Sequence, residues 1–165
     1  MISGRVHLVG DEVDTDMIIP GRYLSLQDPL EIARHVFEGV DPGFAGRVRP
    51  GDVLVAGRNF GGGSSREHAP LGLLGLGLGA VVAMSFARIF YRNAINVGLP
   101  IFVSPGAAGA AVAGKGIAII PETGVIELEG QSFSSDPPSP LVAEIIASGG
   151  LVSWVRIQLA SGKVP

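Results

Sequence analysis

Two successive strand–turn–helix units in the centre of the chain restrict its possible folds more than any other feature. Val53–Ala56 and Ala80–Ala83 are short, uninterrupted apolar runs, and each leads through a turn into a helical pattern that follows a serine, Ser64 or Ser85. An apolar run without alternation is typical of a strand that is buried on both faces. Parallel strands need a crossover, usually a helix, and this spacing supplies one. We therefore predict an α/β fold with some parallel pairing.

The other segments give local predictions. Pro29 is suited to the first turn of a helix, and the turn 121–124 separates two apolar runs as in a hairpin. Patterning predicts strands at 6–9, 117–120 and 125–128, helices at 30–38, 141–147 and 151–159, and loops at 21–28, 41–51 and 132–140.

The composition indicates a folded chain with part of its surface covered. Of the 165 residues, 47% are hydrophobic and 16% are charged, whereas about 25% charged residues are usual. The length fits one domain, residues 1–165, with a single core. Because so few charges are available for the surface, we expect another chain to cover some of it.

Charge and cysteine content exclude several classes of function. The formal net charge is −3 and the basic residues are scattered, which argues against nucleic-acid binding. With no cysteine, the chain offers no thiolate for zinc or an iron–sulfur cluster, so such a metal has to come from elsewhere. The amino terminus does not have the pattern of a secretory signal, and the uncharged stretch 69–87 contains four glycines. We expect a cytoplasmic protein without a membrane span.

The strongest candidate for chemistry is the glycine-rich turn 59–70, NFGGGSSREHAP. Its glycines, Gly61, Gly62 and Gly63, would let backbone amides point at one small anion. A helix that starts at Ser64 would add free amides and the positive end of its dipole. Ser64 and Glu67 also match a capping box, which only satisfies the first helical turn. The spacing leaves both an anion site and a plain helix cap open.

Arg66 favours the anion site. A cation at the second position of a helix opposes the dipole, which makes sense if it faces a carboxylate or a phosphate. The segment lacks the lysine that a phosphate-binding Walker loop requires. It also does not match the G-x-S-x-G nucleophile elbow of serine hydrolases, because Arg66 stands at the position of the last glycine. Nucleotide hydrolysis and serine-hydrolase chemistry are therefore disfavoured.

Three further features have a plain structural interpretation as well as a functional one. Asp14 and Asp16 are expected to form a turn, and they offer too few oxygen ligands for a divalent metal. The three histidines form no local triad and are expected to be structural. The stretch 85–98 is predicted as a helix with Ser85 as its cap, Gly98 as its stop and an apolar face of Phe86, Ile89, Phe90, Ala94 and Val97.

Three motifs in a fixed order resemble one protein family. They are DTDMIIP (14–20), NFGGGSSREHAP (59–70) and SFARIFYRNAINVGLP (85–100). In this combination they are similar to the small subunits of 3-isopropylmalate dehydratases, which resemble the swivelling domain of aconitase. The resemblance covers about residues 4–104, and the C-terminal third agrees in length and general character. It implies a β/β/α swivelling domain that caps a large subunit.

The resemblance also implies a reaction. The family's hydro-lyases move a hydroxyl between adjacent carbons of a small hydroxy di- or tricarboxylic acid by dehydration and rehydration, in leucine biosynthesis for isopropylmalate. The large subunit carries a [4Fe–4S] cluster on its own three cysteines, which agrees with the absence of cysteine here. By the same match Ser64 is the catalytic base, Ser65 and Arg66 hold a substrate carboxylate, and Asp16 has a supporting polar role. The amides of Gly61–Gly63 would stabilise the ionised serine.

Two positions depart from the family pattern. Gly62 stands where many relatives have a cysteine that is not a cluster ligand. Residues 23–26, which the family uses to discriminate the substrate side chain, are Tyr23, Leu24, Ser25 and Leu26 instead of Tyr-Leu-Arg-Thr. The missing arginine leaves a homoaconitase small subunit open as an alternative. A non-catalytic anion-binding module is the alternative from a different class.

Overall fold

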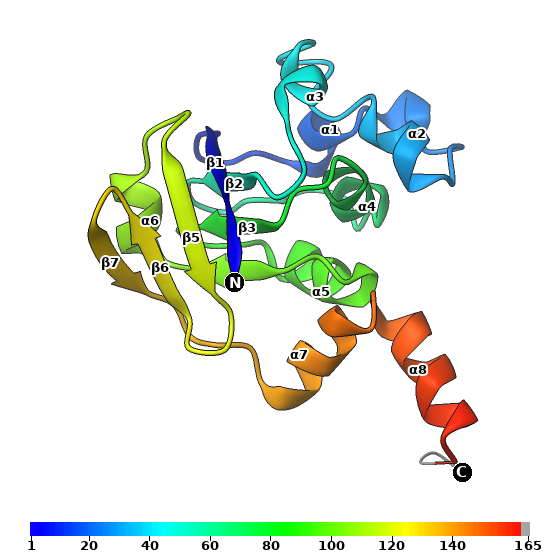
Figure 1. Cartoon of the computed structure of the whole chain (residues 1–165). Coiled ribbons are helices and arrows are strands. Elements are labelled where there is room, and N and C mark those ends of the chain that lie inside the picture. The colour runs from blue at the N-terminus through cyan, green and yellow to red at the C-terminus, as the bar shows by residue number, and fades with distance from the viewer. Residues whose placement is uncertain (163–165) are drawn as a thin grey trace.

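A seven-stranded sheet in the order β4-β3-β2-β1-β5-β6-β7 organises the molecule (Figure 1). The structure is a computed structural model that describes residues 1–162. The parallel half of the sheet consists of β1 (Ile2–Leu8), β2 (Val53–Ala56), β3 (Ala80–Ala83) and β4 (Ile101–Val103). The antiparallel half consists of β5 (Gly116–Ile120), β6 (Val125–Leu128) and β7 (Gln131–Ser134). The first strand joins the two halves, because Ile2–Arg5 pair with β5 and Val6–Leu8 pair with β2.

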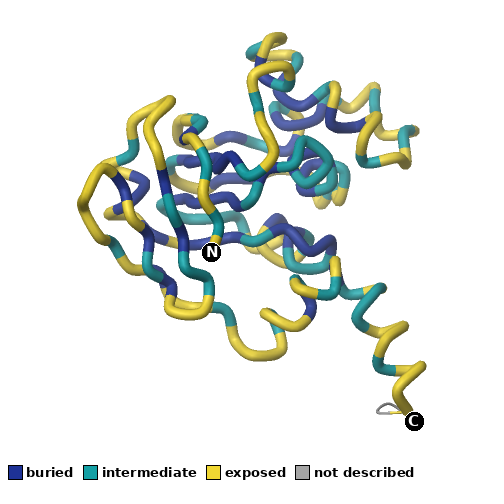
Figure 2. Tube along the Cα trace, in the orientation of Figure 1, coloured by how far each residue is buried: buried dark blue, intermediate teal, exposed yellow. Residues whose placement is uncertain are grey.

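Strands β2 and β3 are buried on both faces, which explains their uninterrupted apolar sequences. Alternate side chains point to opposite faces of a strand. Leu54 and Val81 belong to one hydrophobic cluster, whereas Val55 and Val82 belong to a second cluster on the other face. The centre of the sheet is accordingly dark blue in Figure 2. The predicted α/β fold with some parallel pairing is confirmed.

Helices cover both faces of the parallel half. On the first face lie α1 (Thr15–Ile18), α2 (Pro29–Ala33), α4 (His68–Gly75) and α5 (Arg88–Val97), whose apolar residues share one cluster. The second face is covered by α6 (Pro105–Ala110), which contacts β3, β6 and β7. The 3-10 helix η1 (Gly21–Tyr23) and α3 (Phe44–Arg47) lie in the connections, and α7 (Pro140–Ala147) and α8 (Leu151–Ala160) pack beside α5.

Several predicted elements have different ends in the structure, and each shift has a tertiary cause. The helix predicted at 30–38 ends at Ala33, because Phe37 adopts a left-handed φ of 57° and donates its amide to the Ile18 carbonyl at 2.8 Å. The loop predicted at 132–140 begins with β7, since residues 131–134 pair with β6. The first strand starts at Ile2 rather than residue 6, because β5 pairs with its beginning.

The helix predicted after Ser85 is confirmed at its end and wrong at its start. Gly98 terminates α5 with a φ of 85°. Ala87 is the residue before the first helical turn, and the Ser85 hydroxyl instead accepts a hydrogen bond from the Asn59 amide at 2.9 Å. Phe90, Ala94 and Val97 face the core as predicted, whereas Ile89 is 45% exposed.

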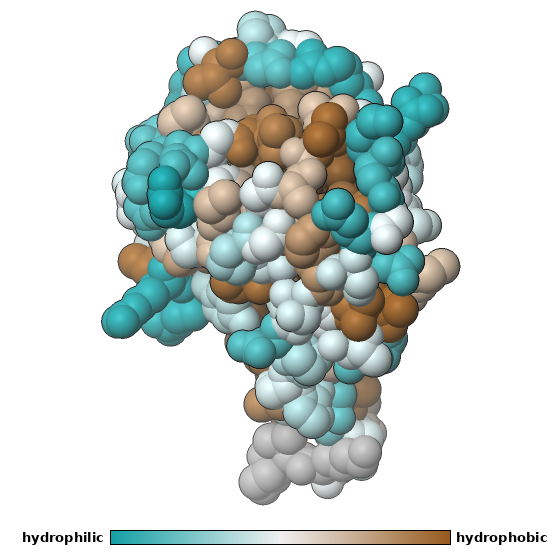
Figure 3. All heavy atoms as spheres, turned by 90° about the vertical axis from the view of Figure 1, so that its left-hand side faces the viewer, coloured by the Kyte–Doolittle hydropathy of each residue, from teal (hydrophilic) through white to brown (hydrophobic). Residues whose placement is uncertain are grey.

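Apolar side chains remain exposed at several places on the surface. On the face shown in Figure 3, hydrophobic patches lie between hydrophilic ones. Helix α8 extends away from the sheet and has no buried residue (Figure 2). Within residues 1–162 no single helix is long and apolar enough to cross a membrane, and α7 with α8 reaches that length only across a bend of 94°.

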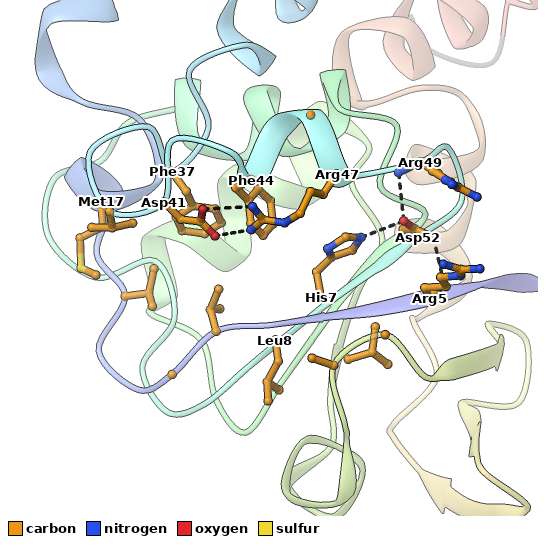
Figure 4. Close-up of a pocket in the computed structure, with 18 residues that line it drawn as sticks. Arg5, His7, Leu8, Met17, Phe37, Asp41, Phe44, Arg47, Arg49 and Asp52 are labelled. Atoms are coloured by element: carbon orange, nitrogen blue, oxygen red, sulfur yellow. Dashed lines mark hydrogen bonds and ion pairs between the residues drawn. The ribbon is translucent and has the colours of Figure 1, made fainter.

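The carboxylate of Asp52 connects the start of β2 to β1 (Figure 4). Its side chain is 6% exposed, and it accepts hydrogen bonds from the backbone amides of Arg5 and Arg49, both at 2.9 Å, and contacts His7 Nε2 at 2.8 Å. Burial by itself raises the pKa of Asp52, but the hydrogen bonds from Arg5, His7 and Arg49 outweigh it, so the pKa lies below its ordinary value.

This depressed pKa predicts a pH dependence of stability. The ionised Asp52 contributes stability above the pKa of an unfolded aspartate, about 3.9, and the contribution is lost as pH falls through the lower folded value. We expect Asp52→Asn to lower the free energy of unfolding at pH 7 by about 1–3 kcal/mol, because an amide cannot accept all three hydrogen bonds. Denaturant titrations from pH 3 to 7 would also show a flatter pH profile. Asp136→Asn, at an exposed position, is the control, and equal profiles for the two variants would contradict the assignment.

Candidate active site

The motifs around Asp14 and Ser64 lie side by side, although 49 positions separate Thr15 from Ser64. The Thr15 amide donates to the Gly62 carbonyl at 2.9 Å, and the Thr15 hydroxyl donates to the Ser64 carbonyl at 3.0 Å. Asp14 acts as the cap of α1, where its carboxylate accepts the Met17 amide at 2.8 Å. The acidic turn therefore positions the glycine-rich loop.

The glycine-rich turn 59–70 contains three residues with positive φ, Asn59 at 52°, Gly61 at 83° and Gly63 at 84°. A Cβ atom on Gly61 would lie 2.2 Å from the Phe90 ring, so only glycine fits there. The Gly61 amide donates to the Val13 carbonyl at 2.7 Å. The expectation that all three glycine amides line an anion site is therefore wrong for Gly61, because the neighbouring loop already uses its proton.

Ser64 is exposed and lies in the loop, not at the start of a helix. Helix α4 begins at His68, its cap position is Glu67, and no side chain caps it. The Ser64 carbonyl, which would accept the His68 amide in a helix, instead accepts the Arg66 amide at 2.8 Å and the Thr15 hydroxyl. The predicted capping box is wrong for this reason.

The loop after Gly62 has several polar groups without an internal partner. Within residues 1–162, the hydroxyls of Ser64 and Ser65 make no hydrogen bond, and the amides of Gly63, Ser64 and Ser65 donate none. All three residues are exposed. These groups are free to bind an anionic ligand without breaking a bond in the chain.

Arg66 forms an ion pair with Asp16, so the structure brings two predicted site residues together. Arg66 is only 21% exposed, and Asp16 is 60% exposed. Because Arg66 lies before α4, the argument from the helix dipole does not hold for it. Its guanidinium is instead held by a carboxylate from α1.

The segment of Tyr23, Leu24, Ser25 and Leu26 follows Gly21, which lies close to this ion pair. A Cβ on Gly21 would lie 3.6 Å from the Arg66 guanidinium. Tyr23 and Leu26 pack against the core, whereas Leu24 is 37% exposed and Ser25 is also exposed. The segment thus exposes one apolar and one small polar side chain, those of Leu24 and Ser25.

Two residues at this site were not assigned from the sequence. Thr15 is 2% exposed and holds the glycine loop with both its amide and its hydroxyl. His68 Nε2 lies 2.8 Å from the Leu26 carbonyl. Both belong to the motifs, but their partners lie more than 40 positions away, so no local pattern gives their contacts.

A separate cavity lies elsewhere on the molecule. It is a groove of about 800 Å³ between β1 and α3, lined among others by His7, Phe44 and Asp52 (Figure 4). Ser64, Ser65 and Arg66 do not line it. In the described part of the chain, no three histidine or acidic side chains are close enough together to hold a metal ion. Gly63, Ser64 and Ser65 of the candidate site are exposed to solvent.

Fold and site together define a class of protein. The family model for the aconitase C-terminal domain matches residues 7–105. A solved 3-isopropylmalate dehydratase structure from Methanocaldococcus jannaschii is 44% identical, with a TM-score of 0.91 over 99% of each chain. The expected aconitase-type swivelling fold is confirmed.

Similar proteins of known name identify the family within the aconitase class. The 3-isopropylmalate dehydratase small subunit of Moorella thermoacetica is 53% identical over 94% of this chain and 95% of its own. The 2,3-dimethylmalate dehydratase small subunit of Eubacterium barkeri is 48% identical over 93% and 96%. The chain belongs to this family of dehydratase small subunits, and the matches include the C-terminal third.

The close contact between Gly61 and Phe90 gives a prediction with a matched control. We expect Gly61→Ala to lower the free energy of unfolding by about 2–4 kcal/mol, from backbone strain at positive φ and overlap with the ring. Gly62→Ala should cost less than about 1 kcal/mol, because its φ is not positive and its Cβ would lie 3.4 Å from Asn59. Thermal and urea unfolding would measure both, and equal losses would contradict the described loop geometry.

Proposed function

We propose that this chain is the small subunit of a 3-isopropylmalate dehydratase. With an iron–sulfur large subunit, it would interconvert 2-isopropylmalate and 3-isopropylmalate through an alkene acid in leucine biosynthesis. One observation carries the proposal: the unbonded Ser64 hydroxyl sits on an exposed loop that also holds the Arg66–Asp16 ion pair. The names of the relatives support the same activity.

Ser64 is proposed to remove the proton from the carbon next to a substrate carboxylate. Such a proton is weakly acidic, so the reaction needs a strong base. A serine oxygen becomes one only if its negative charge is stabilised, and the free amides of Gly63, Ser64 and Ser65 are dipoles of the required sign. Because the loop is exposed, a docked large subunit would exclude water and strengthen these interactions.

Arg66 is proposed to bind a substrate carboxylate, with Ser65 as a second donor. A guanidinium presents a planar fork that matches a carboxylate in a bidentate arrangement. The pair with Asp16 fixes the orientation of Arg66 before substrate arrives and leaves part of its donor fork for a ligand.

The iron–sulfur cluster is proposed to come from the large subunit. This chain has no cysteine, so its own residues do not fit a [4Fe–4S] cluster. When bound by the partner, the cluster supplies a Lewis acid for the departing hydroxyl. The residues of this chain hold the carboxylate and move the proton.

The missing arginine departs from the family pattern, but the side chains that are present in the loop favour isopropylmalate over homoaconitate. Homoaconitate has a third carboxylate, which would need a cation near Leu24 and Ser25. Arg22 is the basic residue of this loop, and it lies 3.6 Å from the Glu38 carboxylate and over the Tyr23 ring. An exposed leucine instead fits an alkyl substituent.

Reconstitution tests this proposal. We expect the chain to bind a candidate iron–sulfur large subunit and to hydrate isopropylmaleate faster than homoaconitate. Ser64→Ala should lower kcat by at least about 1,000-fold, because the base is lost, while the complex still forms. Ser132→Ala, on exposed β7, should keep wild-type activity. Substantial activity of Ser64→Ala would remove Ser64 as the base, and failure to bind or turn over with any large subunit would favour the anion-binding module.

Arg66→Lys tests the carboxylate contact separately. A lysine keeps the charge but loses the bidentate geometry, so we expect KM to rise about tenfold or more with a smaller loss in kcat. Steady-state kinetics of the reconstituted complex would measure this effect. An unchanged KM would contradict the assigned role of Arg66.

A further inference from the structure

The segment Gly21–Leu26 is held at both ends by residues of other elements. Its own backbone forms consecutive turns, with the Leu24 amide bonded to the Gly21 carbonyl at 3.3 Å and the Leu26 amide to the Tyr23 carbonyl at 3.1 Å. Such short turns do not by themselves fix a loop relative to the rest of a protein. The loop is therefore placed by the packing of Tyr23 and Leu26 against the core and by the contacts to α4 and to the chain after α2.

The first attachment is the ring of Tyr23. It stacks on the His35 imidazole with centroids 3.6 Å apart and planes 12° from parallel. His35 Nδ1 lies 2.7 Å from the Glu38 carboxylate. The Tyr23 hydroxyl and then His35 lower the pKa of Glu38 by hydrogen bonding to its ionised form. This cluster holds the start of the loop against the chain that follows α2.

The second attachment is His68, the first residue of α4. Its Nε2 lies 2.8 Å from the Leu26 carbonyl. A carbonyl oxygen has no proton, so His68 Nε2 must be the donor. Ser65 and Arg66 lie just before His68 in the chain, and Gly21 lies against the Arg66 guanidinium. The hydrogen bond thus ties the loop to the same short segment that carries the proposed substrate-binding groups.

We propose that His68 is a positioning residue of the substrate site. By holding the Leu26 carbonyl, it fixes the exposed Leu24 and Ser25 between the two attachments and so sets the space beside Arg66 for the substrate's alkyl group. His68 does not touch the reacting atoms in this arrangement. The specificity part of the inference rests on the function proposed above, whereas the attachment of the loop does not.

The first test needs no activity. Hydrogen exchange of the full chain would compare wild type with His68→Ala and His68→Gln, since the Nε2 of glutamine can donate at about the reach of the histidine Nε2. We expect amides 21–28 to exchange about tenfold faster or more in His68→Ala and near the wild-type rate in His68→Gln. Unchanged exchange in His68→Ala would overturn the inference.

The second test is substrate preference in the reconstituted complex. We expect His68→Ala to raise KM for isopropylmalate more than for 2,3-dimethylmalate, to change kcat less than KM, and to be rescued by His68→Gln. A general loss of stability would lower activity with both substrates alike. If the wild-type complex is active and His68→Ala keeps the wild-type preference between the two substrates, the inference about His68 is wrong and the proposed function still stands. If wild type turns over neither substrate, the proposed function fails and the specificity claim with it.

Discussion

The hydrogen bonds of Thr15 are the contacts on which the candidate site depends. Its amide and hydroxyl hold the carbonyls of Gly62 and Ser64, and the side chain is almost fully buried. A glycine-rich loop is conformationally free and loses much entropy when it is ordered. Bonds from a buried residue of a different element compensate part of that cost and leave the serine hydroxyls unbonded. A rigid loop with unused donors is what a substrate site for anions requires.

The sheet explains why these segments meet. The chain leaves β1, β2 and β3 at the same edge, because the three strands are parallel, and ligand sites of α/β sheets typically lie at the carboxyl ends of strands. The turn of Asp14 follows β1, the glycine loop follows β2, and Ser85 follows β3. Ser85 accepts the Asn59 amide with its hydroxyl and the Phe60 amide with its carbonyl. Three connections are thereby joined into one surface.

That surface is open, which fits a subunit that works with a partner. The chain has few charges for its size, a helix α8 with no buried residue among those described, and a candidate site whose residues 63–65 are exposed. Under the proposed function, this chain would carry the carboxylate-binding and proton-transfer groups, and the large subunit would supply the remaining chemistry. Substrate choice would then depend on a short loop beside Arg66, whose position is set by side chains of neighbouring elements. Relatives named for isopropylmalate and for dimethylmalate share this fold family.

Local sequence was sufficient to predict those elements whose structure depends mainly on residues close to one another in the chain. The apolar runs at 53–56 and 80–83, the stop at Gly98, the hairpin and the last two helices follow from side-chain pattern and glycine positions. The three motifs were likewise sufficient for the family. Only the tertiary structure determined those features in which a group distant in the sequence forms the hydrogen bond that a local helix or ligand site would otherwise use. The Thr15 hydroxyl donates to the Ser64 carbonyl, which the expected helix would have used. The Phe37 amide donates to the Ile18 carbonyl where the predicted helix would have continued, and the Gly61 amide donates to the Val13 carbonyl. Each is a single long-range hydrogen bond that outweighs a local preference of similar size, so neither spacing nor propensity along the chain could indicate it.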